Sequence, residues 1–209
     1  DNAEVNFVQN ECDNQVNFGD IPICLMKIDG MKECYSNPLV KLYTDQFIFE
    51  NNEILGMYLS NDVHSKIDKL GEFLFDDYFK VYSMTSIKNM SLGLDELEII
   101  ASETEKVFNR KNWPDIESRL ENNIDNISFD RPIILNSHWP NKNIKTFVCL
   151  MKTESNGISN ISVMTVNLAL IKDRIICYAY YKSYTGEESI NQAKAKSDYF
   201  GLKFYEVNS

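Results

Sequence analysis

The sequence predicts an α+β fold, a mostly antiparallel sheet covered by helices on both faces, which is an α/β/α sandwich. The first observation is a run of three strand-like segments at 144–154, 160–171 and 174–184. Only the short turns Asn156-Gly157 and Lys172-Asp173 separate them. Parallel neighbours need a crossover of about a dozen or more residues, so these segments must pair antiparallel. The second observation is that apolar residues occupy both faces of the last two segments, which predicts a covering layer on each face.

The first half of the chain predicts short strands and one hairpin. Residues 1–20 alternate polar and apolar types with many Asn, which indicates an irregular lead-in to a single domain spanning 1–209. The apolar run IPICLMKI at 21–28 predicts a strand. Segments 39–51 and 51–62 alternate roughly by two around an Asn-rich turn, so we expect them to form a hairpin.

Helical spacing marks the middle and the end of the chain. Apolar residues recur at steps of three and four in three stretches, which predicts amphipathic helices at 63–78, 91–108 and 112–127. The aromatic and β-branched run YFKVYSMTSI at 78–87 predicts a strand. Thr185 and Glu188 stand in the relation of a capping box, so we expect a terminal helix that ends near Tyr199.

The order of these elements resembles the Mog1/PsbP-like fold. The likeness begins with IPICL at 21–25 and is clearest in the tail LALIKDRIICYAYYKSYTGEESINQAKAKSDYF, where a strand hairpin leads into a helix. The chain departs from that pattern at Met26, where such proteins often carry a turn with Pro, and in its long central helical region. The resemblance implies a protein-binding role, as a chaperone, adaptor or assembly factor, and carries over no catalytic residues.

The charge of the chain narrows the classes of partner. Acidic residues outnumber basic ones 31 to 21, giving a net charge of −10 and a pI near 4.7. Such a chain repels phosphate backbones unless its bases cluster, and they do not, so nucleic acid is not an expected partner. No apolar run approaches the ~18 residues of a transmembrane segment. A protein partner is expected, and the sequence leaves the oligomeric state open.

The five cysteines fall into two groups. Cys149 and Cys177 lie in strand-like patterns, and we expect both to be buried and unpaired. Any two of Cys12, Cys24 and Cys34 could form a disulfide if the protein is exported. The chain begins without Met, so we expect an upstream segment to have been removed. That expectation favours an exported protein, periplasmic or in the cell envelope, over a cytoplasmic one.

Residues 136–143, NSHWPNKN, form the most site-like segment, which we expect to be a loop. Its candidate binding residues are Ser137, His138 and Trp139. Ser137 and His138 do not predict a catalytic dyad, because adjacent side chains in an extended segment point apart. The pair Asp76-Asp77 suits acid/base chemistry or Ca²⁺, although a solvated turn is favoured. No motif predicts a cofactor or a metal site.

Tyrosines cluster on the last strand and supply the other candidate binding residues, Tyr178, Tyr180 and Tyr184. Their favoured interpretation is packing under helices with the hydroxyl groups near water. The alternative is an exposed amphipathic binding surface, where Tyr is enriched. The predicted function is a non-enzymatic protein-binding, assembly or adaptor domain. Two alternatives stay open: a hydrolase-type enzyme that uses 136–143, and an acidic immunity-type protein that neutralises a basic partner.

Overall fold

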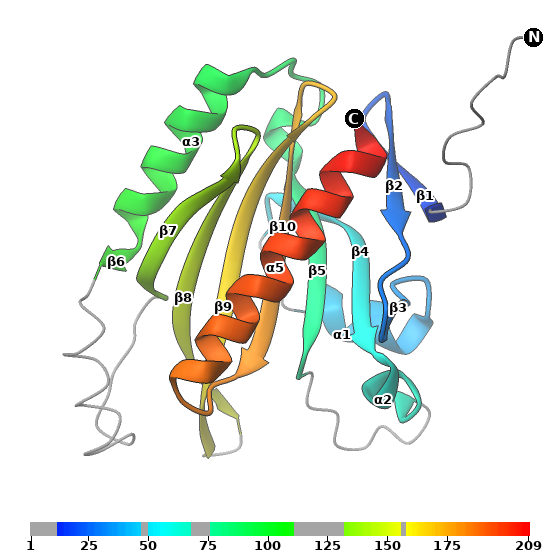
Figure 1. Cartoon of the computed structure of the whole chain (residues 1–209). Coiled ribbons are helices and arrows are strands. Elements are labelled where there is room, and N and C mark those ends of the chain that lie inside the picture. Colours follow the sequence, from blue (N-terminus) through cyan, green and yellow to red (C-terminus); the bar gives the residue numbers. More distant parts are fainter. Residues whose placement is uncertain (1–11, 47–49, 68–75, 111–131, 156–157) are drawn as a thin grey trace, which may run out of the picture.

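An eight-stranded sheet forms the centre of the molecule, and one long helix crosses one of its faces (Figure 1). The computed structural model describes residues 12–46, 50–67, 76–110, 132–155 and 158–209. The strands of the sheet, in spatial order, are β3 (Met31–Glu33), β4 (Asn52–Ser60), β5 (Tyr78–Met84), β10 (Arg174–Ser183), β9 (Ile158–Ile171), β8 (Ile144–Ser155), β7 (Ile133–Asn141) and β6 (Asn109–Arg110). Neighbouring strands are antiparallel except β6, which runs parallel to β7.

The meander predicted from the short turns is confirmed. Strands β8, β9 and β10 are consecutive antiparallel neighbours over the expected segments. Lys172 and Asp173 have φ values of 47° and 58° between β9 and β10. Positive φ at both central residues matches the right-handed twist of the flanking strands, which explains how two residues reverse the chain. The other predicted turn, at 156–157, lies outside the described residues.

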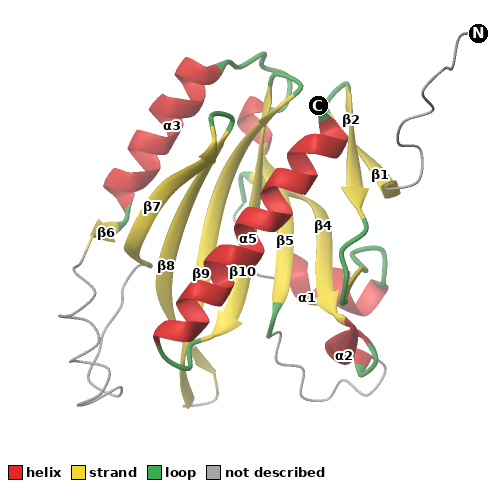
Figure 2. Cartoon of the chain, in the orientation of Figure 1, coloured by secondary structure: helices red, strands yellow, loops and turns green. Residues whose placement is uncertain are grey.

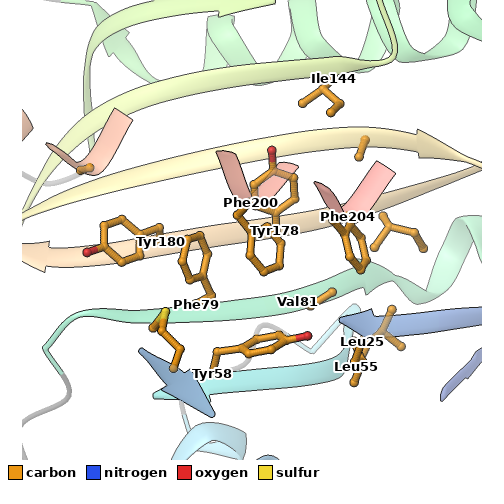
Figure 3. Packing of buried hydrophobic residues seen from close by; sticks show 14 of the residues in the cluster. Leu25, Leu55, Tyr58, Phe79, Val81, Ile144, Tyr178, Tyr180, Phe200 and Phe204 are labelled. Carbon is orange, nitrogen blue, oxygen red and sulfur yellow. The ribbon is translucent and has the colours of Figure 1, made fainter. Parts of the chain in front are cut away.

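Helix α5 (Glu187–Asn208) covers one face of the sheet, which we call the α5 face. Its Phe200 stacks on Phe79 of β5 at a centroid distance of 4.4 Å (Figure 3). The centroid of the Tyr178 ring of β10 lies 4.9 Å from that of Phe200. A two-stranded ribbon of β1 (Cys12–Phe18) and β2 (Ile21–Met26) adds Phe18, Ile23 and Leu25 to this core. Most of the fully buried aromatic side chains therefore lie on the α5 face, whereas Phe147 lies on the other.

The opposite face, which we call the α3 face, carries shorter elements. Helix α3 (Leu94–Val107) packs Leu97 and Ala101 against a cluster that includes Cys149 and Cys177. Both cysteines are buried free thiols, as the sequence predicts. Near β4, the same face carries α1 (Pro38–Asp45), α2 (Asn61–His64) and the 3₁₀ turn η2 (Thr85–Ile87).

The predicted helix-covered sandwich is wrong. The molecule is mostly β, with a large antiparallel sheet and a separate two-stranded ribbon, and helices do not form a full layer on either face (Figure 2). The apolar alternation of β9 and β10 requires burial of both faces but does not specify a helix as the cover. The ribbon shares the α5 face, and α3 covers only part of the opposite face.

Three element predictions also need correction. The hairpin over 39–51 is wrong at its start, because α1 begins there with Asn37 as its N-cap and Pro38 in the first turn. The capping box at 185–188 is absent, because Gly186 is the N-cap and the Thr185 N–H donates to Ser189 Oγ. Helix α5 runs on to Asn208 instead of ending near Tyr199.

Some expectations fall wholly or partly outside the described residues, among them the helix at 112–127 and much of the one at 63–78. The expected helix at 91–108 is confirmed as α3, and the strands expected at 21–28, 51–62 and 78–87 are β2, β4 and β5. Within the lead-in 1–20, residues 12–18 form strand β1. None of the helices that the structure describes is long and apolar enough to cross a membrane.

The ribbon is fixed to the rest of the molecule by two connections. Cys12 and Cys24 form a disulfide between β1 and β2, which is one of the pairings that the sequence allows. The buried side-chain amide of Asn208, at the end of α5, accepts from Cys24 N at 2.7 Å and donates to Cys24 O at 3.0 Å. The last turn of α5 therefore pairs with β2 as a neighbouring strand would.

Candidate functional site

The segment 136–143 is not a loop, because most of it belongs to strand β7. Its residues pair with β8, Ser137 opposite Phe147 and His138 opposite Thr146. Successive side chains of a strand point to opposite faces, and they do so here. Ser137 Oγ donates to Glu105 Oε1 of α3 at 3.0 Å, whereas His138 Nε2 lies 2.9 Å from both carboxylate oxygens of Asp198 in α5. The expectation that these adjacent side chains point apart is confirmed.

On the α3 face, Ser137 belongs to a cluster with Glu105, Lys145 and Trp139. Lys145 Nζ donates to Ser137 Oγ at 3.3 Å and lies 5.1 Å from the centroid of the Trp139 ring. The Trp139 side chain is 41% exposed. Glu105 and Lys145 are not among the candidate site residues predicted from the sequence. Lys145 could have been noticed, because it is a charged residue at the start of a mostly apolar strand. The cluster joins the edge of the sheet to α3.

The outer surface of α3 has an acidic character with exposed apolar side chains. Asp95, Glu98 and Glu103 are exposed along the helix. Ile99 lies between them in sequence and is 61% exposed, and Val107 is 56% exposed. An amphipathic helix usually turns such side chains toward the core, whereas these two face away from it.

On the α5 face, His138 stands at one end of a polar row that crosses four strands. Thr146 of β8 is its cross-strand partner, Asn167 of β9 is the partner of Thr146, and Tyr178 of β10 is the partner of Asn167. Thr146, Asn167 and Tyr178 are fully buried beneath α5. A polar row in the centre of a core is costly unless its groups are hydrogen-bonded.

Most of this row is hydrogen-bonded through Asn167. Its Oδ1 accepts from Thr146 Oγ1 at 2.7 Å and from Ser197 Oγ of α5 at 3.2 Å. Its Nδ2 donates to Thr165 Oγ1 at 3.2 Å and to the Tyr178 carbonyl at 3.0 Å. Thr165 in turn donates to Ser197 at 2.8 Å. We call Thr146, Thr165, Asn167 and Ser197 the polar layer.

The rings of Tyr178 and Tyr180 are buried under α5, which confirms the packing interpretation for both rings and contradicts an exposed surface at these two residues. The expectation for the hydroxyl groups is wrong at Tyr178, because its hydroxyl oxygen is buried as well. Tyr184 is partly buried against the same core. Burial raises the pKa of the Tyr178 hydroxyl above its ordinary range, so it stays protonated.

Asp76 and Asp77 hold the start of β5 against its neighbours. Asp77 Oδ1 accepts from Tyr180 Oη at 2.6 Å and from Lys196 Nζ of α5 at 2.5 Å. Asp76 Oδ1 accepts from the Ser183 N–H at 2.7 Å. Partial burial favours a higher pKa for Asp77, but the Lys196 and Tyr180 hydrogen bonds outweigh it and leave that pKa below its usual value. Asp77 is therefore not simply a solvated turn residue, because its carboxylate links the start of β5 to β10 and α5.

The arrangement around His138 has part of what acid/base catalysis needs. Asp198 orients the imidazole as a carboxylate orients a general base. The hydroxyl of the neighbouring Ser137 is on the opposite face, and Asp198 is the only hydrogen-bond partner of the His138 side chain in the described part of the protein. No group of three or more His, Cys, Asp or Glu side chains among these residues is placed to hold a metal ion.

Comparison of the chain with protein-family models, curated proteins and solved structures finds no match. The resemblance to the Mog1/PsbP-like fold therefore stays a prediction. Function has to be argued from the surfaces and clusters of the chain itself.

Proposed function

We propose that the chain is a non-enzymatic protein-binding domain of the adaptor or assembly type, and that its partner is basic. The observation that carries the proposal is Ile99, an isoleucine 61% exposed on α3 between the acidic side chains of Glu98 and Glu103. We call the docking surface the α3–β7 surface, made of Asp95, Glu98, Ile99, Glu103 and Trp139.

The chemistry of this surface is that of an interface with a complementary charge. Apolar and aromatic side chains in the middle of an interface supply most of the binding energy, and the charged rim supplies specificity and a faster association rate. Trp139 and α3 are connected through Lys145, Ser137 and Glu105. The net charge of −10 extends the attraction of a basic partner beyond direct contact.

The two alternatives relate differently to this surface. An immunity-type role uses the same surface, because neutralising a basic protein is one form of binding it. The hydrolase alternative depends on 136–143, where Ser137 and His138 project from opposite faces of β7. A nucleophile for His138 would have to come from elsewhere, so this alternative has less support.

The test compares two exposed apolar side chains of similar exposure. Partners are isolated on the immobilised wild-type protein from an extract of the source cells, purified, and measured by titration calorimetry. Ile99→Asp is expected to weaken binding about 10-fold or more, as for an interface hot spot. Leu42→Asp, which alters a 62% exposed side chain on α1, is expected to leave the affinity within about 2-fold.

Salt gives the second part of the test. For a basic partner, the association rate should fall as ionic strength rises, and Glu98→Lys combined with Glu103→Lys should remove most of that dependence. Equal affinities for wild type and Ile99→Asp would contradict the proposed surface. An association rate that does not respond to salt would contradict the basic partner.

A further inference from the structure

Two polar atoms beneath α5 lack a hydrogen-bond partner in the part of the chain that the structure describes. They are Nδ1 of His138 and the hydroxyl oxygen of Tyr178, and both atoms are buried. These two residues stand at opposite ends of the row His138, Thr146, Asn167 and Tyr178. A buried polar group without a partner is costly, and native structures contain few of them.

The two atoms are opposite in kind. His138 Nε2 faces both oxygens of Asp198, and because a carboxylate only accepts, we assign the ring hydrogen of the neutral imidazole to Nε2. In that tautomer Nδ1 is an acceptor. Tyr178 brings a hydroxyl hydrogen that stays on the oxygen, since burial raises its pKa. One end of the row therefore needs a donor and the other end offers one.

The polar layer between them cannot supply the missing hydrogen. The hydroxyl hydrogens of Thr146, Thr165 and Ser197 and both amide hydrogens of Asn167 are already donated. Oxygens of Thr165 and Ser197 also accept from within the layer, whereas Thr146 Oγ1 accepts from none of its members. The remaining groups are thus one donor, Tyr178 Oη, and two acceptors, His138 Nδ1 and Thr146 Oγ1.

The Tyr178 hydroxyl points toward strand β8, which carries Thr146 (Figure 3). In Figure 3 it points away from Val81 and toward the side of the sheet where Ile144 of β8 lies. Burial raises the pKa of Tyr178, and Thr146 of the same strand is near enough to lower it by a smaller amount, although the Tyr178 hydroxyl oxygen has no hydrogen-bond partner in the described chain. Three strand spacings, about 14 Å, separate the backbones of Tyr178 and His138, which is more than the two side chains span by direct contact.

We propose that one buried water molecule binds between Tyr178 Oη, His138 Nδ1 and Thr146 Oγ1. The water accepts from Tyr178 Oη and donates its two hydrogens to His138 Nδ1 and Thr146 Oγ1. Three hydrogen bonds are typical of a buried water in a polar setting. The result is a continuous chain from Asp198 through His138 and the water to Tyr178, which ties α5 to β7, β8 and β10 and holds His138 in one tautomer.

The direct test is a crystal structure of the wild-type protein at about 1.5 Å resolution. We expect one density peak about 2.7–3.2 Å from both His138 Nδ1 and Tyr178 Oη. Absence of that peak, or a direct hydrogen bond from Tyr178 Oη to His138 or Thr146 in its place, would overturn the proposal. This measurement needs no variant, so it does not depend on whether a substituted chain folds.

A solution measurement uses oxygen-17 relaxation dispersion, which counts water molecules with long residence times. Tyr178→Phe is expected to lose one such water and to raise the unfolding equilibrium constant about 2- to 10-fold. Tyr58→Phe is the matched control, because that buried hydroxyl donates directly to the Met26 carbonyl at 3.0 Å. It should raise the unfolding constant similarly while the water count stays unchanged. An unchanged water count in Tyr178→Phe would refute the site.

Discussion

The two faces of the sheet are built from strands with the same two-sided apolar pattern, yet their covers differ. On the α5 face, a helix of 22 residues buries aromatic rings and a hydrogen-bonded polar layer, and the ribbon extends the cover. On the α3 face, a helix of 14 residues buries only Leu97 and Ala101 completely and leaves Ile99 in solvent.

The difference lies in which side chains the helices turn inward. The buried positions of α5 combine small and polar residues with two large rings, namely Ser189, Ala193, Ser197, Phe200, Gly201, Phe204 and Asn208. Small side chains let the helix approach the strands, Ser197 hydrogen-bonds to the sheet, and Asn208 hydrogen-bonds to the ribbon. The α5 face is therefore specified by shape and by hydrogen bonds, whereas α3 contributes apolar burial and an exposed outer surface.

The largest expected effect separates the two faces by stability. Phe200→Ala should lower the free energy of unfolding by about 4 kcal/mol, because Phe200 contacts Phe79, Tyr178 and Phe204 in one cluster. Leu97→Ala should cost about 2–3 kcal/mol on the smaller α3 side. Urea unfolding of both variants measures the difference. If Leu97→Ala proved as costly as Phe200→Ala, the two faces would contribute equally and the comparison would be wrong.

A second variant tests how closely α5 approaches the sheet at Gly201, which faces Tyr178 of β10. Gly201→Ala should cost about 2–3 kcal/mol, because the new Cβ would overlap Tyr178 Oη and lie 2.7 Å from its ring carbon Cζ. Removing the hydroxyl by Tyr178→Phe takes away the nearer clash. In a double-mutant cycle, Gly201→Ala should therefore be about 1 kcal/mol less costly in the Tyr178→Phe background than in the wild-type background. If the effects of the two substitutions on the free energy of unfolding were additive, the strain from Gly201→Ala would not arise from contact with the Tyr178 hydroxyl.

Local sequence patterns predict the strands that turns and alternation define. Strands β8 to β10 follow from short turns, and Ser137 and His138 diverge as any neighbours in a strand do. The N-cap Asn37 and the following Pro38 are a usable signal for α1, but the apolar alternation after them points to a strand instead. The predicted terminal helix is also too short, although apolar residues continue after Tyr199 with Phe200, Phe204 and Val207.

The partners of the site residues cannot be predicted from local sequence patterns, because they lie far away along the chain. Asp198 lies 60 residues from His138, and Glu105 lies 32 residues from Ser137. Apolar alternation shows that a strand face is buried but does not identify the element that buries it, which is why the sandwich prediction is wrong. Cross-strand register is needed before Thr146, Asn167 and Tyr178 can be seen as one row.

The smallest expected effect concerns the ion pair that fixes one end of α5. Asp77 receives hydrogen bonds from Tyr180 and Lys196, and its side chain is 34% exposed, so water weakens the contribution. Asp77→Asn should cost about 1 kcal/mol near pH 7. Asp62→Asn is the control, because its ion pair with Lys66 lies on the open surface and should contribute less than about 0.5 kcal/mol.

The pH dependence of this cost tests its electrostatic origin. The folded protein holds the pKa of Asp77 below the ordinary value of 3.8, so the ionised carboxylate favours the folded state. That stability is fully present above the unfolded pKa and is lost as the pH falls through the lower folded pKa. The difference in unfolding free energy between wild type and Asp77→Asn should therefore be constant from about pH 5 to 7 and shrink below about pH 4. A difference that persists unchanged at about pH 2.5 would show that packing, and not the carboxylate charge, holds this end of α5 to the sheet.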